Sequence, residues 1–257
     1  MTTRSYIELS IVFPAYNEAS SIHSVVSAAV AHLDRRGIDY EIQVVDDGSG
    51  DSTREVLDGL RERTPRLRVV RHPVNLGYGA AIRSGIAAAR GRHILVSDGD
   101  GQFRIEDLDS LWQRRNQADL VLGYRNPRND RWHRRLAGWL YGRVLVRLVL
   151  GGRFHDVNCG FKLISRSVVE EMELCSTGAL ISAELLTRAR LLGATFVEIG
   201  VEHFPRRGGR ATGLLPRVVL HMLRELFALR SRILAHGRRQ SAAQLRTKCD
   251  RIESASA

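Results

Sequence analysis

The sequence predicts an α/β fold with a mainly parallel sheet and helices on both of its faces. Short stretches rich in Val, Ile and Leu alternate with longer segments whose apolar residues recur at helical spacing. This alternation is typical of a parallel sheet, because the connection between two parallel strands usually contains a helix. Polar loops follow the first, second and fourth predicted strands, and they would meet at the carboxyl edge of the sheet, where open α/β sheets bind ligands.

The predicted elements follow one another in a regular order. We expect strands at 9–13, 40–45, 67–70, 93–96, 119–122 and 195–201, and a further short strand after the segment 155–162. Helical spacing predicts helices at 22–36, 53–63, 80–89, 105–116, 166–173 and 180–192. Pro14 should stop the first strand. Ser20 or Ser21 is the candidate cap of the first helix, and Asp51 or Ser52 is that of the second.

Two arginine-rich apolar stretches differ from this pattern. Residues 132–150 are too charged to span a bilayer, and they could lie in a membrane interface or pack as an ordinary helix. Residues 216–237 predict a basic amphipathic helix that fits a membrane surface, a partner groove or the domain itself. We therefore divide the chain into one domain, residues 1–213, and a C-terminal basic amphipathic helix with a polar tail, residues 214–257.

Arginine carries nearly all the positive charge of the 257 residues, whose formal net charge is +11. This balance suggests partners that bear phosphate, such as nucleotides, anionic lipids or nucleic acid. Because no recognised nucleic-acid-binding motif occurs, we expect no nucleic-acid partner. The three cysteines lack metal-binding spacing and favour a reducing compartment. With no signal peptide and no apolar run long enough to span a bilayer, we expect a protein in the cytoplasm, at the cytoplasmic face of the membrane.

Two carboxylates, one residue apart, follow the fourth predicted strand. Asp98 and Asp100 would leave its carboxyl end, and carboxylate oxygens are the ligands that a hard divalent cation prefers. Gly99 and Gly101 would let the backbone approach a ligand closely. A solvated Asp-Gly turn is the alternative from this pattern alone. Glu184 could lie near the same edge, although a structural salt bridge is the simpler role for it.

Six motifs in order along the chain are recognisable together: Pro14-Ala15-Tyr16-Asn17-Glu18, Asp46-Asp47-Gly48-Ser49, Asn75-Leu76-Gly77, Asp98-Gly99-Asp100-Gly101-Gln102, Asp156 to Phe161, and the loop from Arg206. Over about residues 8–213 the chain resembles the inverting glycosyltransferases of family 2, whose GT-A fold is Rossmann-like. Within that family it most resembles the dolichol-phosphate mannosyltransferase type. The resemblance implies a nucleotide-sugar donor carrying GDP or UDP, a polyprenyl phosphate acceptor, Mg²⁺ or Mn²⁺ as cofactor, and peripheral contact with the membrane.

The resemblance also implies roles for individual residues. Those expected around the donor base and ribose are Pro14, Tyr16, Glu18, Val45 and Asp47. Those expected at the pyrophosphate are Asp98, Gly99 and Asp100, and the expected metal ligands are Asp98, Asp100 and Gln102. Arg125 and Arg206 would contact phosphate. Arg210 stands where relatives often carry the first lysine of Gly-Lys-Ser-Lys, whereas Thr212 does not replace the second.

The candidate catalytic residues are Asp100, Arg125 and Asp156. Asp156 is expected on the acceptor side, as a positioning residue or a base, and a turn or capping role is its alternative. A polyprenyl phosphate would need no base, because the second pKa of a phosphate monoester is about 6 and the group is already anionic near neutral pH. The alternative function is a family member acting on a soluble hydroxyl acceptor, and a catalytically inactive nucleotide-sugar sensor is a third possibility.

Overall fold

The computed structural model describes residues 7–126 and 154–205, together with Leu229 and Ser231. The arginine-rich stretch 132–150, the helix expected after Pro216, and the loop residues Arg206 and Arg210 lie outside the described residues. The division of the chain at residues 213 and 214 therefore stays a prediction. No helix within the described ranges is long and apolar enough to cross a membrane.

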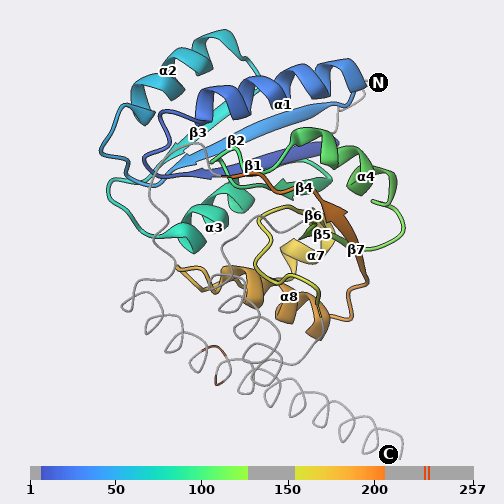
Figure 1. The fold of residues 1–257 in the computed structure, drawn as a ribbon. Coiled ribbons are helices and arrows are strands. Elements are labelled where there is room, and N and C mark those ends of the chain that lie inside the picture. Colours follow the sequence, from blue (N-terminus) through green and yellow to red (C-terminus); the bar gives the residue numbers. More distant parts are fainter. Residues whose placement is uncertain (1–6, 127–153, 206–228, 230, 232–257) are drawn as a thin grey trace, which may run out of the picture.

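Seven strands form one sheet in the described part of the chain (Figure 1). They are β1 (Leu9–Ala15), β2 (Tyr40–Asp46), β3 (Leu67–Arg71), β4 (His93–Val96), β5 (Leu120–Arg125), β6 (Lys162–Ser165) and β7 (Phe196–Val201), in the order β3-β2-β1-β4-β6-β5-β7. Only β6 among them runs antiparallel to its neighbours, β4 and β5. The mainly parallel sheet that the sequence predicts is confirmed.

Helices cover both faces of this sheet (Figure 1). One face carries α1 (Ile22–Arg36), α2 (Thr53–Arg63) and α4 (Leu108–Gln113). The 3₁₀ turn η1 (Ile105–Asp107) directly precedes α4. The other face carries α3 (Tyr78–Ala88), α7 (Arg166–Glu170) and α8 (Ile181–Leu191). Because side chains alternate along a strand, Ile11 and Phe13 enter the core under α1, whereas Val12 enters the core under α3. The sheet is thus packed between two hydrophobic layers.

The first strand is longer than predicted. We expected Pro14 to stop it, but β1 continues to Ala15, and Pro14 pairs with Val45 of β2. The carbonyl of Val12 accepts a hydrogen bond from the N–H of Ser97 on the β4 side, 3.0 Å, and Pro14 faces the same side two residues later. Because β4 ends at Val96, no ladder bond is required of Pro14 there, and its missing N–H costs nothing.

Helix starts also differ from the expectation in instructive ways. Ser21 stands at the N-cap of α1 but makes no side-chain capping bond, because its hydroxyl lies 2.7 Å from Oε2 of Glu18. The helix predicted from residue 105 begins as the 3₁₀ turn η1. Helix α3 begins at Tyr78, two residues earlier than its alanine-rich stretch suggested. This earlier start places Tyr78 at the carboxyl edge of the sheet.

At the opposite, amino edge, a buried carboxylate joins β1, β2 and the segment that leads into β4. Glu41 is 2% exposed and accepts hydrogen bonds from the hydroxyl of Ser10, 2.7 Å, and from the backbone N–H and Nη2 of Arg90, 2.6 and 2.8 Å. Burial by itself would raise the pKa of Glu41, but the bonds from Ser10 and Arg90 hold it below its ordinary value of 4.5. The charged carboxylate therefore stabilises the fold.

Glu41→Gln should lower the free energy of unfolding at pH 7 by about 1–3 kcal/mol, because hydrogen bonds to a charged group are lost. The folded pKa lies below the unfolded one, so this contribution is present above about pH 4.5 and is lost as the pH falls through the folded pKa. Urea unfolding at pH 7 and pH 3.5 measures the difference between variant and parent. Asp39→Asn, which removes an exposed partner of Arg66, is the control and should change little. An equal effect of Glu41→Gln at both pH values would contradict this assignment.

Candidate active site

The loop after β4 crosses the end of β1 at close range. A Cβ atom at Gly99 would lie only 2.9 Å from the carbonyl oxygen of Pro14 and 3.3 Å from Cδ1 of Ile22, so only glycine fits this crossing. The hydroxyl of Ser21 lies 3.2 Å from the carbonyl oxygen of Gly99 and can donate either to it or to Glu18. The loop that carries the two predicted metal ligands is therefore fixed against β1 and the start of α1.

Asp98 is held between two different segments. The hydroxyl of Tyr78 donates a hydrogen bond to its Oδ1, 2.6 Å, and on another side the carboxylate lies against Gly160, where any Cβ atom would collide with it. Burial and the nearby charge of Asp98 raise the pKa of Tyr78 well above 10. The hydroxyl therefore stays protonated and remains a donor.

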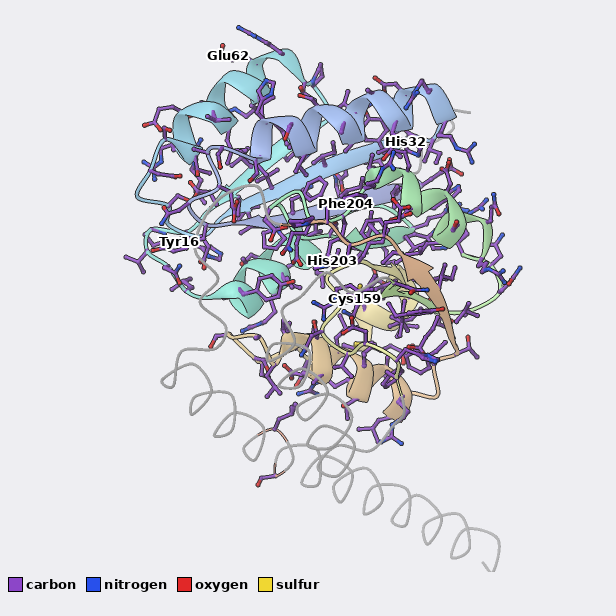
Figure 2. The ribbon with its side chains drawn as sticks, viewed as in Figure 1. Tyr16, His32, Glu62, Cys159, His203 and Phe204 are labelled. Carbon is purple, nitrogen blue, oxygen red and sulfur yellow. The ribbon has the colours of Figure 1, made fainter. Side chains whose placement is uncertain are left out.

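Asp100 and Gln102 form a compact turn. Asp100 is 8% exposed, and its Oδ1 accepts a hydrogen bond from the backbone N–H of Gln102, 3.0 Å. The side-chain amide of Gln102 donates to the carbonyl of Phe204, 3.1 Å, and lies 3.3 Å from Nε2 of His203. His203 and Phe204, labelled in Figure 2, follow β7 and were not predicted as site residues, because nothing in their sequence context marks them.

The loops after β1 and β2 are joined by hydrogen bonds. The backbone N–H of Asn17 donates to Oγ of Ser49, the N–H of Gly50 donates to Oδ1 of Asn17, and the N–H of Glu18 donates to Oγ1 of Thr53, at 3.0, 2.8 and 2.9 Å. Among the residues predicted around the donor base, Tyr16 is 48% exposed at the end of the sheet (Figure 2), whereas Glu18 and Val45 are buried. Their contact with a donor stays a prediction.

Asp47 organises the turn that precedes α3. Its two carboxylate oxygens accept hydrogen bonds from the backbone N–H groups of Leu76 and Gly77, both 2.9 Å, and Nδ1 of His72 lies 2.6 Å from Oδ1. Nε2 of His72 in turn lies 2.9 Å from the hydroxyl of Ser84. The structure thus gives Asp47 a role in fixing this backbone, and a direct bond from Asp47 to the donor stays a prediction.

The second half of the chain brings a charged cluster to the same edge. Nε and Nη2 of Arg125 donate to the two carboxylate oxygens of Asp156, 2.6 and 2.9 Å, and the two side chains are 12% and 10% exposed. Lys162 is 3% exposed, and its ammonium donates to the carbonyl of Cys159. Burial lowers the pKa of Lys162, while the charges of Asp156 and Asp98 act in the opposite direction. Gly160 lies against the carboxylate of Asp98, so this cluster adjoins the loop after β4.

Glu184 has the structural role that the sequence favoured for it. It is fully buried in α8 and accepts hydrogen bonds from the N–H groups of Cys175 and Ser176, 3.0 and 2.7 Å, and from Nε of Arg188, 2.8 Å. Glu184 thus fixes the segment 175–177. The carbonyl of Thr177 in this segment accepts a hydrogen bond from the N–H of Gly79, 2.7 Å, so Glu184 helps to hold the start of α3 in place.

A divalent cation would find oxygen ligands on Asp98 and Asp100 and on the amide oxygen of Gln102. In the described part of the chain no group of three or more His, Cys, Asp and Glu side chains converges as a metal cage. A site with two carboxylates suits Mg²⁺ or Mn²⁺ that shares its remaining positions with water and substrate phosphate. The donor atoms that are present therefore fit this kind of cation.

A separate cavity of about 360 Å³ lies between α1 and the segment 101–106. Phe13, Val25, Phe103 and Phe204 are among the residues that line it, and Ser97 also borders it, whereas Asp98 and Asp100 do not. The cavity is thus a neighbour of the carboxylate loop and does not open onto the two carboxylates.

Solved structures share this architecture. Glucosyl-3-phosphoglycerate synthase from Mycobacterium tuberculosis, crystallised with Mn²⁺, uridine diphosphate and glucosyl-3-phosphoglycerate, superposes with a TM-score of 0.68 at 22% identity and covers 87% of this chain and 80% of that one. This likeness establishes the fold as GT-A.

Curated relatives are more similar in sequence. A dolichyl-phosphate beta-glucosyltransferase of Trichomonas vaginalis is 32% identical over 212 residues, 76% of this chain and 65% of that protein. A dodecaprenyl-phosphate galacturonate synthase of Rhizobium johnstonii is 33% identical over 175 residues, 65% of this chain and 51% of that protein. The dolichyl-phosphate beta-glucosyltransferase of Drosophila melanogaster is 29% identical over 94% of this chain and 80% of that protein. The chain spans about half to two thirds of the length of the first two.

The fold and these relatives point to one family of glycosyltransferases. The sequence model of Glycosyl transferase family 2 matches residues 10–173, and the chain belongs to that family. The resemblance drawn from the six motifs is thereby confirmed.

Gly99→Ala should weaken the binding of a nucleoside diphosphate with Mn²⁺ by about tenfold, or 1.4 kcal/mol. The reason is that the added Cβ would push the loop away from Pro14. Gly59→Ala in α2 is the matched control, because a Cβ there meets no atom within 4 Å. Isothermal titration calorimetry with UDP and GDP measures both variants. If both variants bind UDP and GDP as tightly as the parent does, the close contact between Gly99 and Pro14 is not needed for donor binding.

Proposed function

We propose that the chain transfers a sugar from a nucleotide-sugar donor to a polyprenyl phosphate, with inversion at the anomeric carbon and with Mg²⁺ or Mn²⁺ as cofactor. The observation that carries this proposal is that two segments meet at one edge of the sheet: Gly160, close to the Arg125–Asp156 pair in the fold, lies against the carboxylate of Asp98, and Lys162 pairs with Val96 at the end of β4. The relatives from Trichomonas, Rhizobium and Drosophila are all named for polyprenyl phosphates, which supports the acceptor.

Asp98, Asp100 and Gln102 are the residues that would hold the cation. When bound, it would supply positive charge against the charge that develops on the departing nucleoside diphosphate. The protein contributes the orientation: Tyr78 and Gly160 fix Asp98, and the N–H of Gln102 fixes Asp100. Such preorganised ligands need no rearrangement during the reaction.

The donor base and ribose would lie beside the joined loops after β1 and β2. Tyr16 is the exposed aromatic side chain there and offers a stacking surface, and Pro14, Glu18, Val45 and Asp47 shape the backbone around it. The residues of this region would determine whether the donor carries GDP or UDP. The Mycobacterium enzyme was crystallised with UDP and Mn²⁺, so these are the first ligands to try.

The acceptor phosphate would meet the positive charge of Arg125, and Arg206 and Arg210 are further predicted contacts. Because both oxygens of Asp156 accept hydrogen bonds from Arg125, we assign Asp156 to positioning rather than to proton abstraction. This fits an acceptor whose phosphate is already anionic near neutral pH and needs no base. An acceptor of this kind is a membrane lipid, so peripheral contact at the cytoplasmic face of a membrane forms part of the proposal.

Asp100→Asn should lower turnover by at least about 100-fold, because a metal ligand that stabilises the leaving group contributes several kcal/mol. The fold should persist, since asparagine keeps the Oδ1 that accepts from Gln102. Asp39→Asn, which removes a carboxylate paired with the exposed Arg66 at the opposite edge of the sheet, is the control and should leave turnover unchanged. Turnover that survives excess EDTA in the parent protein would contradict the role of the metal.

Incubation with UDP- and GDP-sugars and a short polyprenyl phosphate should give a lipid-linked sugar, measured by mass spectrometry. The matching polyprenol, which lacks the phosphate, should not react, because the phosphate oxygen is the nucleophile. Transfer only to soluble hydroxyl acceptors would instead support the alternative function within the same family and would remove the lipid acceptor from the proposal.

A further inference from the structure

We propose that Tyr78 is a positioning residue of the donor site, whose hydroxyl fixes the orientation in which Asp98 meets the divalent cation. This inference rests on the proposed function, because it takes Asp98 as a metal ligand. Tyr78 lies in none of the candidate positions that the sequence suggested, and it reaches Asp98 from the first residue of α3, 20 residues earlier in the chain.

The contact between the two side chains is short and specific. The hydroxyl of Tyr78 donates to Oδ1 of Asp98 over 2.6 Å, while Gly160 closes off another side of the carboxylate. A carboxylate that leaves a strand end without such contacts would rotate about its side-chain bonds. Here the rotation is restricted by one hydrogen bond and one steric wall.

Tyr78 is itself held in place by the turn before it. Gly77 has a φ of +100°, and a Cβ atom there would lie 2.5 Å from the carbonyl oxygen of Thr177, so this turn admits only glycine. Asp47 holds the N–H groups of Leu76 and Gly77, and Thr177 accepts a hydrogen bond from Gly79. The start of α3 is thus fixed on both sides of Tyr78, and its hydroxyl has one defined position at the edge of the sheet.

This arrangement links two residues that the sequence placed in separate parts of the donor site. Asp47 fixes the turn, the turn fixes Tyr78, and Tyr78 fixes Asp98. Hydrogen-bond partners of metal ligands usually change metal affinity by 10- to 100-fold when they are removed. Tyr78 is therefore expected to act on metal affinity before any reaction takes place.

The test compares Mn²⁺ binding to the full chain, measured by electron paramagnetic resonance of the free ion, without donor or acceptor. Tyr78→Phe should weaken Mn²⁺ binding by about tenfold. Tyr40→Phe is the matched control, because it removes a hydroxyl that donates to Oδ1 of Asp34, 2.9 Å, at the opposite edge of the sheet, and it should leave Mn²⁺ affinity unchanged.

Asp98→Asn separates the two ways in which this can fail. If Asp98→Asn abolishes Mn²⁺ binding while Tyr78→Phe binds as the parent does, the role of Tyr78 is overturned and the metal site stands. If Asp98→Asn also binds Mn²⁺ as the parent does, the metal site is wrong and the role of Tyr78 falls with it. A loss of affinity in Tyr40→Phe equal to that in Tyr78→Phe would show general loosening of the fold and would likewise overturn the assignment.

Discussion

The direction of β6 is the constraint on which the site depends. This short strand enters between β4 and β5 and runs antiparallel to both, so that Lys162, its first residue, pairs with Val96, the last residue of β4. The segment before β6 therefore lies at the carboxyl edge of the sheet, beside the loop of Asp98. A parallel β6 would carry Asp156 and Gly160 to the opposite edge, away from Asp98 and Arg125.

The edge of the sheet is built from loops that hold one another. Backbone groups of the β1 loop bond to side chains of the β2 loop, Gly99 rests on Pro14, and the amide of Gln102 bonds to the carbonyl of Phe204. These contacts join segments that lie up to about one hundred residues apart. A site of this construction has its polar groups arranged before a ligand arrives, which is the condition for electrostatic stabilisation of a transition state.

Much of this could be predicted from the sequence. The apolar stretches mark the strands, and the polar residues that follow β1, β2 and β4 do meet at one edge, because local periodicity and the geometry of a parallel sheet suffice to place them. The length of β1 was misjudged at Pro14, because the strand there has a ladder partner on one side only. Local sequence could not show that β4 ends at Val96, which pairs with Val12, two residues before Pro14.

Other features could not be read from local patterns. The direction of β6 depends on how distant strands pack, and four residues carry no signal of it. The pairing of Arg125 with Asp156 joins residues 31 positions apart, and that of Tyr78 with Asp98 joins residues 20 apart. The family resemblance singled out Asp47, Asp98 and Asp156 as candidates for contact with substrates. The structure adds the hydrogen-bond partners of each carboxylate within the protein. These partners indicate which carboxylates hold the backbone or another side chain of the site in place and which can face a ligand.

The central claim is that a divalent cation and a nucleoside diphosphate bind where β4 ends. A crystal structure of the full chain with Mn²⁺ and UDP or GDP, with anomalous data collected at the manganese edge, tests it most directly. The account predicts one anomalous peak within about 2.0–2.3 Å of carboxylate oxygens of Asp98 or Asp100, beside the diphosphate. A diphosphate bound elsewhere, for example in the cavity between α1 and the segment 101–106, with no manganese at either carboxylate, would contradict it.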